Sequence, residues 1–207
     1  MRTSVLFITM LLIALGAGAQ GIKDFRPGRY YDNSGNRHDG FIKYKYNNKR
    51  KIYFRAGPNE KAISLRPDDL KSFVVKADSF MVLRNFYLDR KKPGGRMPAD
   101  FAKVVEPGPL TLVRHYSIQK SDYYGYAAPT AGNYVGIEGV KTYYLVSLPS
   151  NAVTVVNFDR DLFKTNMASF FSGVPEIAEK IRNGKYLWED MPEVVRLYNQ
   201  QVSNREN

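Results

Sequence analysis

The feature that most constrains the fold is a series of short alternating segments in residues 40–76, separated by residues typical of turns. The clearest segment alternates a mainly basic set of side chains with an apolar set: Phe41, Lys43 and Lys45 against Ile42, Tyr44 and Tyr46. A period of two predicts a strand with one basic and one buried face. Asn47-Asn48 and residues 57–60 then read as turns between successive strands. We therefore expect several short strands in sequence order.

Similar signals continue to residue 157, where the hydrophobic period changes from that of a strand to that of a helix. We predict an α+β fold over residues 28–157, mainly an antiparallel β sheet or small open barrel of roughly nine to eleven strands. A C-terminal helical segment of two to three short helices follows, at 161–171, 175–182 and from Asp190. The predicted domains are a β-rich domain (20–157) and a helical tail packed on it (158–203). Residues 204–207 are expected to fray.

Three local expectations accompany this fold. Residues 67–70, Pro-Asp-Asp-Leu, suit a single helical turn, because Pro and acidic residues favour a helix N-terminus. Residues 89–100 contain Arg-Lys-Lys-Pro-Gly-Gly-Arg and are expected to interrupt the sheet as a flexible basic loop. Residues 119–140 are rich in Tyr and Gly and read as a long loop.

The N-terminus has the organisation of a secretory signal peptide (residues 1–19). Arg2 precedes an apolar run from Val5 to Leu15, and small residues lead to Ala19. We predict cleavage between Ala19 and Gln20. The run is shorter than the roughly 20 residues that span a bilayer, although a buried N-terminal helix or an anchor is the alternative interpretation. After cleavage, 188 of the 207 residues remain, and no other segment reaches membrane-spanning length.

The chain contains no cysteine. This excludes a disulfide scaffold, a thiolate zinc site, a catalytic cysteine and the lipid anchor of bacterial lipoproteins. A cysteine-free exported chain without an N-x-[ST] sequon suits a bacterial envelope. The predicted location is the periplasm, the periphery of the outer membrane or the extracellular space.

The net charge is +11, and it falls to +10 when Arg2 is removed with the signal peptide. Such a charge favours association with anionic polymers or surfaces. For an exported protein we expect acidic glycans, lipopolysaccharide or an envelope protein as partners rather than nucleic acid. The alternative is that the Lys and Arg side chains only solvate one face of the sheet.

Two segments are candidates for binding a partner: the loop at 119–140, which is rich in Tyr and Gly, and the basic loop at 90–96. Tyrosines on a glycine-rich backbone provide rigid aromatic area on an adaptable loop, and basic loops attract anions. The alternatives are a variable hairpin tip and a solvated connector. Residues 49–51, Lys-Arg-Lys, form a further basic cluster. The candidate partner-binding residues are Tyr123, Tyr124, Tyr126, Tyr134, Arg90, Lys91, Lys92 and Arg96.

No catalytic, cofactor or metal site is predicted. The two histidines, His38 and His115, lack ligands at metal spacing and are interpreted as surface or sheet-packing residues. No nucleophile elbow, phosphate-binding loop or dinucleotide fingerprint occurs. The acidic pairs Asp68-Asp69 and Glu189-Asp190 lie where turns and helix caps explain them.

Several short motifs resemble those of uncharacterised exported β-rich proteins common in Bacteroidetes. The resemblance covers most of the mature chain and implies a cell-envelope or secreted location, but no activity. Residues 119–140 depart from the pattern of the group. The matching stretches are Gly40-Phe41-Ile42, Lys51 to Phe54, Leu65 to Phe73, Phe163 to Phe171, Pro175-Glu176, Gly184 to Tyr186, Val194 to Asn199 and the Ala19-Gln20 junction.

Two functions remain open from the sequence. The first is a non-catalytic envelope or secreted module that binds an anionic glycan, lipopolysaccharide or a protein, with a structural subunit of an envelope assembly as a variant. The second is a hydrolase of envelope sugars whose two carboxylates are brought together by the fold, about 5–10 Å apart.

Overall fold

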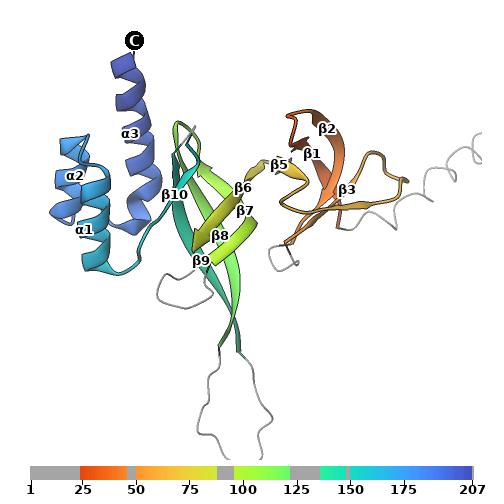
Figure 1. Cartoon of the computed structure of the whole chain (residues 1–207), viewed down its shortest axis with the longest axis horizontal. Coiled ribbons are helices and arrows are strands. Elements are labelled where there is room, and N and C mark those ends of the chain that lie inside the picture. Colours follow the sequence, from red (N-terminus) through yellow and green to blue (C-terminus); the bar gives the residue numbers. More distant parts are fainter. Residues whose placement is uncertain (1–23, 46–49, 88–95, 122–135, 148–149, 207) are drawn as a thin grey trace, which may run out of the picture.

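The computed structural model describes residues 24–45, 50–87, 96–121, 136–147 and 150–206 (Figure 1). In these residues ten strands form one antiparallel sheet in the order β10-β9-β8-β7-β6-β5-β1-β2-β3-β4. The sheet is open, with β4 and β10 at its edges, so the predicted α+β fold with an open antiparallel sheet is confirmed. The strands are β1 (Arg26–Asp32), β2 (Arg37–Lys43), β3 (Ile52–Arg55), β4 (Ile63–Leu65), β5 (Leu70–Val75), β6 (Asp78–Tyr87), β7 (Arg96–Glu106), β8 (Leu110–Ser121), β9 (Gly136–Ser147) and β10 (Ala152–Val155).

The C-terminal helical segment is also confirmed. It consists of α1 (Arg160–Phe170), α2 (Pro175–Arg182) and α3 (Met191–Glu206), with the short 3₁₀ helix η1 (Trp188–Asp190) before α3. Asp159 caps α1 by accepting hydrogen bonds from two backbone N–H groups, and Pro175 opens α2. The last helix is longer than expected: its 16 residues include positions 204–206, which the sequence predicts to fray.

Two local predictions were wrong, and the bounds of a third were wrong. Residues 67–69 form a turn rather than a helical turn: the Asp69 N–H donates to the Arg66 carbonyl at 2.9 Å, and the Asp69 carboxylate accepts from the Arg66 N–H at 2.7 Å. Residues 96–100 belong to β7 and pair with β6, despite the Gly and Pro residues around them. The loop predicted at 119–140 begins later and ends earlier, since β8 and β9 remain paired as far as Ser121 and Gly136; residues 122–135 lie outside the described residues.

The helices pack on one face of β8 and β9. Leu112 and Leu145 from the two strands meet Phe163, Phe171 and Ile181 from the helices, and all five side chains are at most 1% exposed. Figure 1 shows the helices gathered at one end of the molecule and β1–β3 at the other. The helical tail therefore leaves the β1–β3 end uncovered.

Two further clusters of buried residues lie on opposite faces of the sheet where β6 and β7 pair. Phe80 and Phe101 join an aromatic cluster with Phe73 from β5, whereas Leu83 and Ala102 join the other. This alternation follows from the two-residue period of a strand. The first cluster supports the end of the sheet that carries the site described next.

Candidate functional site

A pocket of about 290 Å³ lies at the end of the β1–β2 pair, beside the β5–β6 hairpin. The residues around it share two properties: most are charged, and the others belong to or pack against the buried cluster that contains Phe73, Phe80 and Phe101. The lining residues are Asp24, Arg26, Ile42, Lys43, Tyr44, Lys45, Val75, Lys76, Asp78 and Phe80.

Strand register explains why these residues meet. Arg26 at the start of β1 lies opposite Ile42 near the end of β2, so their side chains share a face. Lys76 occupies the tight β5–β6 turn with φ of +55°, and its N–H donates to the Pro27 carbonyl at 3.2 Å. Gly28 brings β1 and β5 close together: a Cβ there would lie 2.4 Å from the Val74 carbonyl oxygen.

The floor of the pocket is aromatic. The Tyr44 ring meets the rings of Phe73, Phe80 and Phe101 edge to face, with centroids 5.1, 5.0 and 6.0 Å away. Phe73 and Phe80 stack on each other at 4.6 Å. Edge-to-face and offset contacts of this kind hold aromatic side chains in fixed positions. The charged groups at the rim therefore stand on a rigid base.

The rim is mainly cationic. Arg26, Lys43, Lys45 and Lys76 face two carboxylates, Asp24 and Asp78. Lys43 forms an ion pair with Asp24 at 2.5 Å, and Lys45 lies 3.9 Å from the same carboxylate.

Asp78 is paired with Lys103, a cation from outside the lining residues, at 2.5 Å. The hydrogen bond and the charge of Lys43 lower the pKa of Asp24. Both carboxylates thus have cationic partners, and the remaining positive charge can hold an anion.

Of the eight partner-binding residues predicted from the sequence, the structure describes only Arg96. Arg96 is exposed at the start of β7 and donates to the Asn85 amide oxygen at 3.3 Å, away from the lining residues of the pocket. The other seven nominated residues, Arg90, Lys91, Lys92, Tyr123, Tyr124, Tyr126 and Tyr134, lie outside the described residues, as do Ala19 and Gln20.

The two histidines have carboxylate partners. His38 stacks on Tyr30 and contacts Asp32 at 3.1 Å, and this hydrogen bond is the main cause of the lowered pKa of Asp32. His115 is 1% exposed and contacts Asp100 at 3.0 Å. Among the described residues, no group of three His, Cys, Asp or Glu side chains is placed to hold a metal ion.

Sequence reasoning missed the pocket, although part of its signal was visible. The alternation of Lys43 and Lys45 with Tyr44 predicts a strand with one basic and one buried face, but not a pocket. Nothing in the local sequence indicates that Arg26 and Lys76 come to the same place, because that depends on the pairing of β1 with both β2 and β5.

In the described part of the chain, no helix is both long enough and apolar enough to cross a membrane. No protein-family model matches this sequence, and no curated protein or solved structure matches it significantly.

Proposed function

We propose that the protein is an exported, non-catalytic binding protein of the cell envelope whose pocket takes an anionic group of a glycan or of lipopolysaccharide. The observation that carries this proposal is the pocket itself: four cationic side chains surround an aromatic floor in a volume of about 290 Å³. Carboxylate and phosphate groups are the anions that such lysine and arginine clusters recognise. Export is supported by the signal-peptide pattern of residues 1–19.

The energetics suit a modest, salt-sensitive affinity. A pair of unit charges about 4 Å apart contributes on the order of 1 kcal/mol in water and about 4 kcal/mol near a protein surface. Part of the attraction is offset because Asp24 already pairs with Lys43. At about 1 M salt the screening length falls to roughly 3 Å, so binding that depends on this pocket should weaken strongly.

Binding is favoured over hydrolysis by the state of the pocket carboxylates. A glycosidase needs one carboxyl group with a raised pKa to act as the general acid. In this pocket Lys43 lowers the pKa of Asp24, and Lys103 pairs with Asp78. We therefore expect an acidic sugar to be bound without being cleaved.

The test is isothermal titration calorimetry, which measures the affinity of the whole chain for glucuronate, for glucose and for purified lipopolysaccharide. Glucuronate should bind and glucose should not, and the lipopolysaccharide arm shows whether its phosphates occupy the same pocket. Lys76→Gln should weaken binding by roughly five- to tenfold, because one rim charge is lost. The proposal fails if neither glucuronate nor lipopolysaccharide binds, or if binding is equal at about 0.05 and 0.5 M salt.

Lys185→Gln is the matched control, because Lys185 is an exposed lysine after α2 and does not line the pocket. It should leave the affinity unchanged.

N-terminal sequencing of exported material tests the location: the expected first residue is Gln20, and an intact Met1 would contradict cleavage. An assay for new reducing ends with an acidic polysaccharide tests the hydrolase alternative, and we expect none.

A further inference from the structure

A second basic surface lies on the other face of β1, β2 and β3, which we call the outer face. Residues that are opposite in register share a face, so Arg29 lies with Asp39, Tyr31 with Arg37, and Phe41 with Arg55. Lys43 lies beside Tyr53 on this face and also lines the pocket. The outer face and the pocket are therefore continuous at Lys43. The outer face comprises Phe25, Arg29, Tyr31, Arg37, Asp39, Phe41, Lys43, Lys51, Tyr53 and Arg55.

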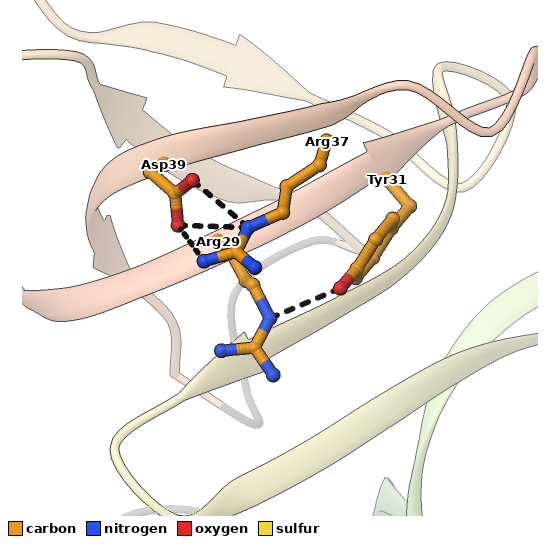
Figure 2. Close-up of polar contacts among 4 residues, drawn as sticks. All are labelled: Arg29, Tyr31, Arg37 and Asp39. Carbon is orange, nitrogen blue, oxygen red and sulfur yellow. Dashed lines mark hydrogen bonds and ion pairs between the residues drawn. The ribbon is translucent and has the colours of Figure 1, made fainter.

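The outer face has more cations than carboxylates. Its five cationic side chains share the surface with Asp39, and Asp24 adds a carboxylate at the pocket end. Arg37 binds the Asp39 carboxylate through Nε and Nη2, at 2.7–3.1 Å (Figure 2). Arg37 lowers the pKa of Asp39, so this carboxylate stays charged. Lys43 pairs with Asp24, whereas Arg29, Lys51 and Arg55 form no ion pair within the described residues.

A hydrogen bond to Tyr31 positions the Arg29 side chain, and Arg29 forms no ion pair within the described residues. Its Nε donates to the Tyr31 hydroxyl at 3.1 Å, which orients the guanidinium. Figure 2 shows the two terminal nitrogens of Arg29 directed away from Tyr31. Within the described residues these nitrogens make no hydrogen bond. A guanidinium held in this way presents its donors in the planar fork that fits a carboxylate.

Cations lie over two of the four aromatic rings of the outer face, those of Tyr53 and Phe25. The Lys51 ammonium lies 4.8 Å from the centre of the Tyr53 ring, and the Arg55 guanidinium lies 4.1 Å from that of Phe25. Proteins that bind single-stranded nucleic acid rely on open ring faces for base stacking. Because cations cover the Tyr53 and Phe25 rings and the Tyr31 hydroxyl already accepts from Arg29, the surface favours a ligand recognised through charges and hydrogen bonds, as an acidic polysaccharide is.

The outer face is also longer than one sugar unit. Arg37 and Lys43 are six residues apart on β2, which at the usual strand rise of about 3.3 Å per residue corresponds to roughly 20 Å. We propose that the outer face and the pocket form one extended site for an acidic polysaccharide, with several acidic units along β2 and one in the pocket. This inference rests on the proposed function of the pocket and defines the class of ligand further.

The test is titration of the whole chain with oligogalacturonates of one to eight units at low salt. Affinity should rise at least tenfold between the monomer and the longest chain, because further acidic units reach the outer face. Arg29→Gln should weaken binding of the long chain by roughly fivefold and leave the monomer unchanged. Lys76→Gln should weaken both. Lys185→Gln is the control, with circular dichroism confirming that each variant is folded.

The outcomes separate the two proposals. Equal affinities for all chain lengths, or a long chain unaffected by Arg29→Gln, would overturn the extended site while leaving the pocket intact. If the long chain binds and only Arg29→Gln weakens it, the pocket is not part of the site and both proposals fail as stated. A single-stranded oligonucleotide that binds more tightly than the oligogalacturonate of equal charge would also overturn the inference.

Discussion

The side-chain amide of Asn199 in α3 makes two hydrogen bonds with the backbone of Leu110 at the start of β8. Its oxygen accepts from the Leu110 N–H at 3.1 Å, and its nitrogen donates to the Leu110 carbonyl at 2.8 Å. The same nitrogen lies 3.3 Å from the Pro107 carbonyl. The amide thus pairs with the end of β8 as a neighbouring strand would. It holds α3 against the sheet through Leu110, a residue that lies 89 positions before Asn199 in the chain.

Asn199→Asp should therefore destabilise the fold. The substitution keeps the shape of the side chain but replaces the donor with an oxygen that faces two carbonyl groups. We expect a loss of about 1–3 kcal/mol, the typical cost of leaving a hydrogen-bonding group unpaired. Urea unfolding would measure it. Gln200→Glu, at the exposed neighbouring position, makes the same chemical change away from this contact and should have little effect.

Gly40→Ala should destabilise the β2–β3 pair. A Cβ at Gly40 would lie 2.2 Å from the Arg55 carbonyl oxygen and 2.8 Å from the Phe54 ring, closer than atoms can approach. Relief requires a shift of backbone, and overpacking of this kind typically costs about 1–3 kcal/mol. The urea midpoint should fall accordingly. Gly173→Ala is the control, because a Cβ there would meet nothing within 4 Å; equal midpoints for the two variants would contradict the prediction.

Asp100→Ala should cost more stability than the loss of an exposed ion pair. Asp100 accepts from His115, whose side chain is 1% exposed, so its removal leaves a buried N–H without a partner. We expect a loss of about 1–3 kcal/mol in thermal or urea unfolding. Asp68→Ala is the comparison: Asp68 pairs with Arg84 but is 82% exposed, and exposed pairs contribute little. A larger effect for Asp68→Ala would refute the expected ranking.

The sheet and the helices could be predicted because their signals are local. The alternation at Ile42 and Tyr44 and the helical spacing of Phe163, Met167 and Phe171 each depend on residues a few positions apart. The boundaries were less predictable where pairing overrides local preference. Arg96 follows two glycines but extends β7, because β6 provides a partner strand for it.

The candidate site could be predicted only in part. Lys43 and Lys45 are recognisable from the alternation, but the pocket also needs Arg26 and Lys76, which reach it through the pairing of β1 with β2 and β5. The left-handed backbone at Lys76, a residue that seldom adopts it, is likewise set by the hairpin and not by residue type. The net charge of +11, by contrast, follows from composition alone, and it favours an anionic partner without locating a site for it.

Tyr144 should make stability depend on pH in the alkaline range. Its side chain is 1% exposed and its hydroxyl donates to the Tyr87 carbonyl at 3.0 Å. Burial raises the pKa of Tyr144 from the usual 10 to about 12. Because the folded-state pKa is the higher one, the contribution is fully present below pH 10 and is lost as the pH rises towards 12.

Tyr144→Phe should therefore be less stable than the natural protein at pH 8, by about 1 kcal/mol for the lost hydrogen bond. The natural protein should then lose this advantage between pH 10 and 12, since Phe has no proton to release and two pKa units correspond to about 2.7 kcal/mol at most. Urea unfolding at a series of pH values measures the difference. Tyr53→Phe, at a half-buried position on β3, controls for the ionisation of the other tyrosines. A difference between the natural protein and Tyr144→Phe that stays constant across this range would show that Tyr144 titrates alike in the folded and unfolded chains.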